Sequence, residues 1–177
     1  MIEKLNTEYF IEFNNFLPKQ IFIESYEKLL KSSNWQFSGC SDVENKEAYV
    51  FWYHELINDD FYSKFFLKRV EQFCSQKFKV NRIYANGQTF GLSGLLHTDD
   101  DRENTYTFLY YLNPHWDISW GGSTVFQKNS EEFISYIPKP NTGILFKSNM
   151  LHVGMEPSRA CKNLRITIAL KLEIGND

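Results

Sequence analysis

The pattern of the chain changes after Lys77, and this change constrains the fold more than any other feature. From there on, short apolar runs alternate with turn residues such as Asn86-Gly87 and Asn113-Pro114. Runs of this length and composition predict strands. We expect eight, over residues 78–85, 94–99, 105–113, 122–126, 132–137, 142–147, 150–155 and 163–173. They predict a jelly roll of two packed antiparallel sheets, although a generic β-sandwich binding domain gives the same pattern.

The first third of the chain predicts helices that support this β region. Residues 8–16 suggest a strand, and Pro18 begins a helix whose apolar side chains repeat at helical spacing. A second helix is expected from the Asn58-Asp59-Asp60 segment to about Gln76. We therefore expect one domain over 1–177, with a helical support region at about 1–77 and a β core at about 78–173.

Composition limits the classes of partner. The 16 Phe, 10 Tyr and 4 Trp supply a large apolar core. A net charge of −3 gives no global attraction to nucleic acid or to anionic membranes. The three cysteines have no metal-type spacing, and no stretch has a signal-peptide or membrane-spanning pattern. These features predict a soluble, cytoplasmic protein without a membrane partner, and they leave its oligomeric state open.

Two histidines and a carboxylate form the first candidate site. In a strand, His97 and Asp99 would project to the same face, whereas Asp100 would point the other way. His152 lies within another expected strand. Such residues are often surface turns or half-buried structural histidines. Together, however, they are the set that makes a facial triad on iron(II) and leaves three coordination positions open.

The final strand carries a candidate anion site. Across residues 163–171, the even positions are all apolar, whereas the odd positions, including Arg165 and Thr167, are polar or small. If the polar face lines the mouth of the barrel, Arg165 and Thr167 form a fork-plus-hydroxyl site for a carboxylate. An ordinary amphipathic edge strand would show the same alternation. Tyr110 and Tyr84 carry hydroxyls on nearby strands, where most aromatic side chains fill the core.

The order of these residues resembles that of the 2-oxoglutarate/iron(II) dioxygenases. More closely, residues 79–172 are similar to the prolyl 4-hydroxylase catalytic domain. The landmarks are RIYANGQTFG before His97-x-Asp99, FLYYLNPHW after it, WGGSTVF, PKPNTGILF with His152 following, and the final LRITIALKL. The resemblance implies a double-stranded β-helix with helices ahead of the barrel.

The resemblance also implies roles for the candidate residues. His97, Asp99 and His152 would bind Fe(II), and Arg165 would bind the distal carboxylate of 2-oxoglutarate. Tyr110 would contact the same carboxylate, and Tyr84 would contact the cosubstrate elsewhere. Thr167 would supply a hydroxyl close to Arg165. The reaction would consume O₂, with ascorbate as an optional reductant. Collagen-type members have lysine where this chain has Arg165, which argues against collagen as the substrate.

Other functions remain open at this point. A jelly-roll module could bind a metal or ligand without catalysis, and the same three ligands could hold zinc in a hydrolase. Arg165 argues against the hydrolase, which needs no anchor for a diacid. For an oxygenase, the substrate could be a protein or peptide side chain, a free amino acid, another small molecule or a nucleobase. The net negative charge of the chain argues against a nucleic-acid substrate.

Overall fold

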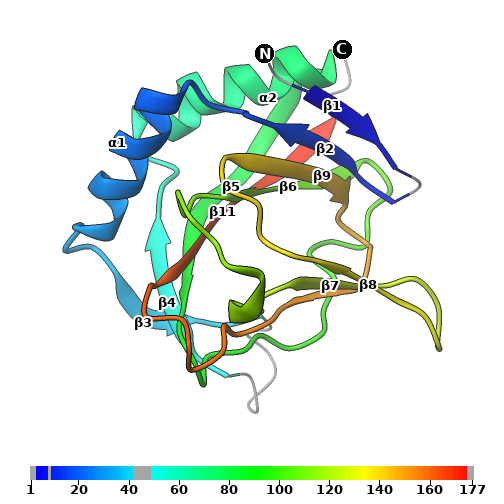
Figure 1. The fold of residues 1–177 in the computed structure, drawn as a ribbon. Helices are drawn as coiled ribbons and strands as arrows, with labels where there is room; N and C mark the ends of the chain where they lie inside the picture. Colours follow the sequence, from blue (N-terminus) through cyan, green and yellow to red (C-terminus); the bar gives the residue numbers. More distant parts are fainter. Residues whose placement is uncertain (1–2, 8, 42–48, 175–177) are drawn as a thin grey trace.

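A computed structural model describes residues 3–7, 9–41 and 49–174, and its two β-sheets face each other (Figure 1). The large sheet has the order β1-β2-β9-β6-β11-β5-β4-β3, and the small sheet has the order β10-β7-β8. The strands of the two sheets are β1 (Glu3–Asn6), β2 (Ile11–Asn14), β3 (Gln36–Gly39), β4 (Phe51–Glu55), β5 (Phe78–Gln88), β6 (Thr105–Tyr111), β7 (Thr124–Gln127), β8 (Phe133–Tyr136), β9 (Thr142–Lys147), β10 (His152–Gly154) and β11 (Arg165–Ile174). The helices of the chain are α1 (Lys19–Leu30), the π-helical η1 (Phe61–Phe66), α2 (Leu67–Cys74) and the short 3-10 helix η2 (Ile118–Trp120).

α1, η1 and α2 cover the outer face of the large sheet, and α1 and α2 appear in Figure 1 on the side away from β7 and β8. Successive side chains of a strand point to opposite faces, so the even-numbered residues of β11 face the helices. Ile166, Ile168 and Leu170 are fully buried there with Phe66 and Val70. This outer core fixes the large sheet against the helices.

A second apolar cluster fills part of the space between the two sheets. Phe126 of β7 and Phe146 of β9 meet edge to face, with ring centroids 4.9 Å apart. Leu109, Tyr111 and Ala169 belong to the same cluster and come from the inner faces of β6 and β11. Both faces of the central strands are therefore buried, one against helices and the other inside the barrel.

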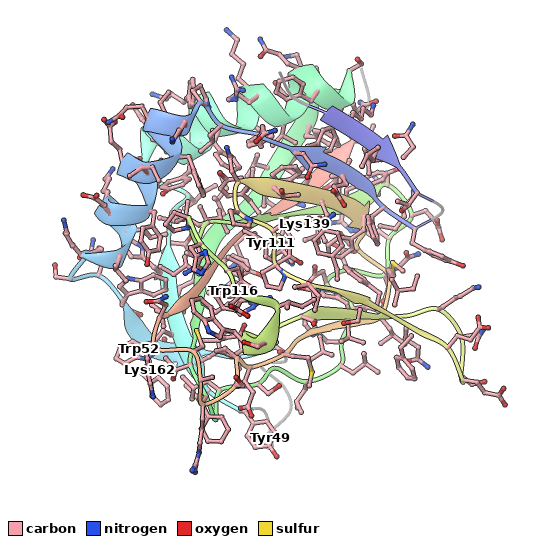
Figure 2. All side chains as sticks on the ribbon, in the orientation of Figure 1. Tyr49, Trp52, Tyr111, Trp116, Lys139 and Lys162 are labelled. Atoms are coloured by element: carbon pink, nitrogen blue, oxygen red, sulfur yellow. The ribbon has the colours of Figure 1, made fainter. Side chains whose placement is uncertain are left out.

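An ion pair connects an N-terminal strand to the loop before β9. Glu12 of β2 is buried, and its Oε1 lies 2.9 Å from Nζ of Lys139, a residue labelled in Figure 2. Burial by itself would raise the pKa of Glu12, but the hydrogen bond from Lys139 and its charge outweigh it and lower the pKa below its ordinary value.

The structure confirms the predicted mainly β jelly roll with helices on one sheet. The expected strand at 142–147 matches β9, whereas the expected strand at 94–99 is reduced to one isolated bridge between His97 and His152. The first 77 residues contain more than helices, because β1 to β4 extend both edges of the large sheet. The expected strand at 8–16 is the shorter β2. None of the described helices is long and apolar enough to cross a membrane.

Candidate active site

A cavity of about 740 Å³ opens between the sheets, on the inner face of the large one. The inner residues of β5 and β11 form one wall, because the two strands pair along almost their whole length. His97, Asp99 and His152 line the same cavity. A volume of this size is typical of small-molecule sites.

The two histidines are brought together by backbone pairing. The N–H of His97 donates to the carbonyl of His152 at 3.0 Å, and the reverse bond is 2.9 Å long. Directly opposed residues of an antiparallel pair project to the same side, and the ring centroids lie 4.5 Å apart. This single bridge therefore places the two histidines side by side, which is the effect we expected from a strand at 94–99.

Both imidazoles are oriented by a backbone carbonyl. Nδ1 of His97 lies 2.8 Å from the carbonyl oxygen of Leu95, and Nδ1 of His152 lies 2.9 Å from that of Met150. A carbonyl can only accept, so each Nδ1 carries a proton and each Nε2 is the ring nitrogen that can bind a metal. This arrangement is the usual one for metal-binding histidines.

Asp99 completes the group, whereas Asp100 does not belong to it. One ligand atom from each of His97, Asp99 and His152 lies within 4.8 Å of the others. Nε2 of His97 is 3.3 Å from Oδ1 of Asp99, and Nε2 of His152 is 3.5 Å from Oδ2. The carboxylate of Asp100 instead pairs with Arg102 at 2.8 Å.

The outer oxygen of Asp99 is held by two further side chains that the sequence did not single out. Oδ2 accepts a hydrogen bond from the hydroxyl of Thr107 at 2.5 Å and contacts the ammonium of Lys171. Burial by itself would raise the pKa of Asp99, but the charge of Lys171 outweighs it and holds the pKa well below its ordinary value. Burial lowers the pKa of His152 to about 4, so this imidazole is neutral at neutral pH.

Arg165 forms a second polar centre on the same cavity wall. Its side chain is fully buried, and three neutral acceptors hold it: the carbonyl of Gly122 at 2.6 Å, Oε1 of Gln88 at 2.7 Å and Oγ1 of Thr124 at 3.2 Å. No carboxylate of the described residues lies within 4.0 Å of it. Three of the five guanidinium N–H groups are used, which leaves one on each terminal nitrogen. Gly122 allows this approach, because a Cβ there would lie 3.1 Å from Cδ of Arg165.

The tyrosine at this centre is Tyr111, and the expectation for Tyr110 is wrong. Tyr110 lies on the helix side of β6, where its hydroxyl donates to Oδ1 of Asn141 at 2.7 Å. Tyr111 points from β6 into the space between the sheets (Figure 2), and its hydroxyl donates to Oγ1 of Thr124 at 2.8 Å. The guanidinium of Arg165 lies 5.8 Å from its ring centre. Strand parity gives the physical reason, since neighbouring residues face opposite sides.

The remaining predicted residues lie on the cavity wall. Thr167 and Tyr84 both line the cavity. Thr167 lies two residues after Arg165 on β11, and Tyr84 lies four residues before Gln88, the partner of Arg165 on β5. Lys171 follows on the same face of β11, and its ammonium lies 5.6 Å from the centre of the Tyr84 ring. The alternation of side chains along the strand would have identified Lys171, because Lys171 and Arg165 both belong to its odd-numbered polar face.

The donor set fits a divalent transition metal. Two imidazoles and one carboxylate on one side of a cavity are the protein ligands of a facial triad. The cavity has space beside them, and the buried guanidinium of Arg165 lies on the same wall. The residues therefore suit both an iron(II) ion and an anionic cosubstrate.

Comparisons with known proteins agree with this geometry. The 2OG-Fe(II) oxygenase superfamily matches residues 78–170, which is more than half of the chain. No curated protein sequence matches the chain significantly.

Solved structures share the fold at low sequence identity. A Trichoplax adhaerens prolyl hydroxylase, solved with a hypoxia inducible factor oxygen degradation domain peptide, superposes with a TM-score of 0.76 and 20% identity, covering 96% of this chain and 86% of that one. A Pseudomonas putida prolyl-4-hydroxylase gives 0.67 and 14%, covering 96% and 94%. A 2OG-Fe(II) oxygenase family oxidoreductase from Burkholderia pseudomallei gives 0.66 and 11%, covering 94% and 86%.

The family match spans the cavity residues from Tyr84 to Arg165, and its members are dioxygenases that use Fe(II), 2-oxoglutarate and O₂. The His-Asp-His group provides the matching iron-binding set. The chain belongs to the 2OG-Fe(II) oxygenase superfamily.

Proposed function

We propose that this dioxygenase hydroxylates a C–H bond of an amino-acid side chain, with proline as the first residue to test. The observation that supports 2-oxoglutarate use most directly is the buried Arg165, whose two remaining N–H groups face no carboxylate among the described residues. A buried cation is costly unless a counter-ion accompanies it. The distal carboxylate of 2-oxoglutarate supplies that counter-ion.

The chain's own residues have separable roles in this proposal. Nε2 of His97, Nε2 of His152 and Oδ1 of Asp99 bind the metal, while Thr107 and Lys171 hold the other oxygen of Asp99. Iron(II) together with 2-oxoglutarate supplies the activation of O₂ that inserts an oxygen atom into the substrate.

At the other end of the cavity, Arg165 binds the cosubstrate through a two-bond fork. Tyr111 and Thr124 extend this polar surface, and Thr167 lies between it and the metal group. Tyr84 lines the same wall closer to the metal ligands.

The preference for an amino-acid substrate is supported by the two prolyl hydroxylases among the similar structures and by the landmarks between His97 and Arg165.

One experiment tests the proposed reaction. The protein would be incubated with Fe(II), 2-oxoglutarate and ascorbate, alone and with free amino acids or proline-containing peptides. Succinate and the mass of the candidate substrate would then be measured. We expect substrate-dependent succinate release, with one added oxygen atom per substrate, that is lost in His97→Ala and His152→Ala. Succinate release that persists in both variants would contradict the assigned metal group.

A further inference from the structure

The cavity has a second cationic end, opposite the Arg165 end. The pairing of β5 with β11 places Gln88 against Arg165 and Arg82 against Lys171. Both strands present every second residue to the cavity, so six residues separate the two ends along β11. At about 3.3 Å per residue, this is roughly 20 Å. One end suits the cosubstrate, which leaves the function of the other to be explained.

Arg82 is held against two aromatic rings at this second end. Its guanidinium carbon lies 4.7 Å from the centre of the Tyr84 ring and 5.3 Å from that of Tyr53. The charges of Lys171 and Arg102 are each met by a carboxylate, whereas no carboxylate of the described residues lies within 4.0 Å of Arg82. Stacked guanidinium groups are well oriented to bind carboxylates. Arg82 is thus an oriented cation with donors available to a ligand.

The charge of the cavity wall favours an anionic substrate. Among the described residues, five basic and three acidic side chains line the cavity, which gives these side chains a formal charge of +2 in a chain whose net charge is −3. The basic ones are Lys79, Arg82, Arg102, Arg165 and Lys171, and the acidic ones are Asp99, Asp100 and Glu173. Iron(II) and the 2-oxoglutarate dianion cancel each other's charge, so the loaded cavity keeps its positive excess. Such an excess attracts anions and selects for them.

Asn86 indicates that the substrate also carries a hydrogen-bond donor. Its side chain lines the cavity between Tyr84 and Gln88, and its Oδ1 is buried without a hydrogen-bond partner among the residues that the structure describes. A buried acceptor without a donor is destabilising. The 2-oxoglutarate dianion has no N–H or O–H to offer, so a substrate nitrogen or hydroxyl is the matching group.

We propose that Arg82 binds the carboxylate of the substrate, and that the substrate is an amino acid with a free α-carboxylate and an N–H. This inference rests on the proposed function and defines its substrate more narrowly. A free amino acid and the last residue of a peptide share this chemistry. An internal residue of a protein lacks the carboxylate and does not fit.

The test is equilibrium binding to protein loaded anaerobically with Mn(II) and saturating 2-oxoglutarate, so that the Arg165 end is already occupied. The probes are L-amino acids with cyclic, apolar, basic, acidic and amide side chains, each beside its carboxamide. N-acetylated dipeptides with a free or amidated terminus form a second set. Binding of 2-oxoglutarate itself is measured first.

The variant is Arg82→Gln, and its matched control is Arg159→Gln. Arg159 also lies against an aromatic ring, 4.9 Å from the centre of Phe90, but it does not line the cavity. Because Arg82 is partly exposed, we expect about a five- to tenfold weaker affinity for the carboxylate probes in Arg82→Gln. Affinity for the amides, and all affinities in Arg159→Gln, should stay unchanged.

The outcomes separate the two proposals. Absence of 2-oxoglutarate binding to the metal-loaded protein would contradict the proposed function. Normal 2-oxoglutarate binding, with carboxylates binding no better than amides or with no probe binding at all, would overturn the assignment of Arg82. Preference for free amino acids or for dipeptides would identify which source of the carboxylate the site accepts.

Discussion

Replacing Arg165 with methionine retains much of the side-chain volume while removing every guanidinium donor. The two N–H groups that Gln88, Thr124 and Gly122 leave unused are the ones we assign to 2-oxoglutarate. A charge-assisted pair in a dry site contributes about 1.5–3 kcal/mol. At about 1.4 kcal/mol per decade, Arg165→Met should weaken 2-oxoglutarate binding by on the order of ten- to 150-fold.

The assay is calorimetric titration of 2-oxoglutarate into anaerobic, metal-loaded protein, with Arg165→Lys as the graded comparison. An ammonium cannot reproduce the two-bond fork, so the lysine variant should recover only part of the affinity. Metal affinity should stay nearly constant in both variants, because the guanidinium is not a ligand. Unaltered 2-oxoglutarate affinity in a folded, metal-binding Arg165→Met protein would refute the assignment.

Three further predictions follow from neighbouring contacts. Tyr111→Phe should weaken 2-oxoglutarate binding about three- to tenfold. Tyr110→Phe should instead lower the free energy of unfolding by about 1 kcal/mol, and equal effects on binding would contradict the strand parity. Asp99→Asn should abolish metal binding in a titration that leaves Asp100→Asn unchanged, and loss in both would point to a different ligand set. Glu12→Gln should lower the free energy of unfolding by about 1 kcal/mol at pH 7. Because the folded pKa of Glu12 lies below its ordinary value of 4.5, that stabilisation is present above pH 4.5 and lost as pH falls through the folded pKa. In urea unfolding, the difference in free energy of unfolding between wild type and Glu12→Gln should be smaller at pH 3 than at pH 7. An equal difference at both pH values would rule out the ionised carboxylate as its cause.

Local sequence patterns predicted the parts of the site that depend on alternation within one strand. The odd face of β11 carries Arg165 and Thr167 into the cavity because strand side chains alternate over a long, uninterrupted run. The same rule, applied to β6, excludes Tyr110 and selects Tyr111. That error arose because a family likeness located the tyrosine pair but not the member of the pair that faces inward.

The features that the sequence did not predict depend on contacts between distant segments. β3 and β4 are short, and they become strands because β4 pairs with the edge of β5 and β3 pairs with β4, which no local periodicity reveals. The segment before Asp99 shows the converse, because only His97 pairs with His152. Lys171 lacked a distinctive motif, and its contact with Asp99 follows from the path of β11 past the metal ligands.

The alternation along β11 also bears on how such a protein can change its substrate over evolutionary time. Ile166, Ile168 and Leu170 maintain the outer core, while the residues between them face the cavity. A point substitution at Ala169 or Lys171 therefore alters the reaction chamber without removing a side chain from the helix-facing core. Insertion of a single residue would exchange the two faces and would disrupt both at once. Diversification should thus proceed by replacement on this strand, with changes of length confined to the loops.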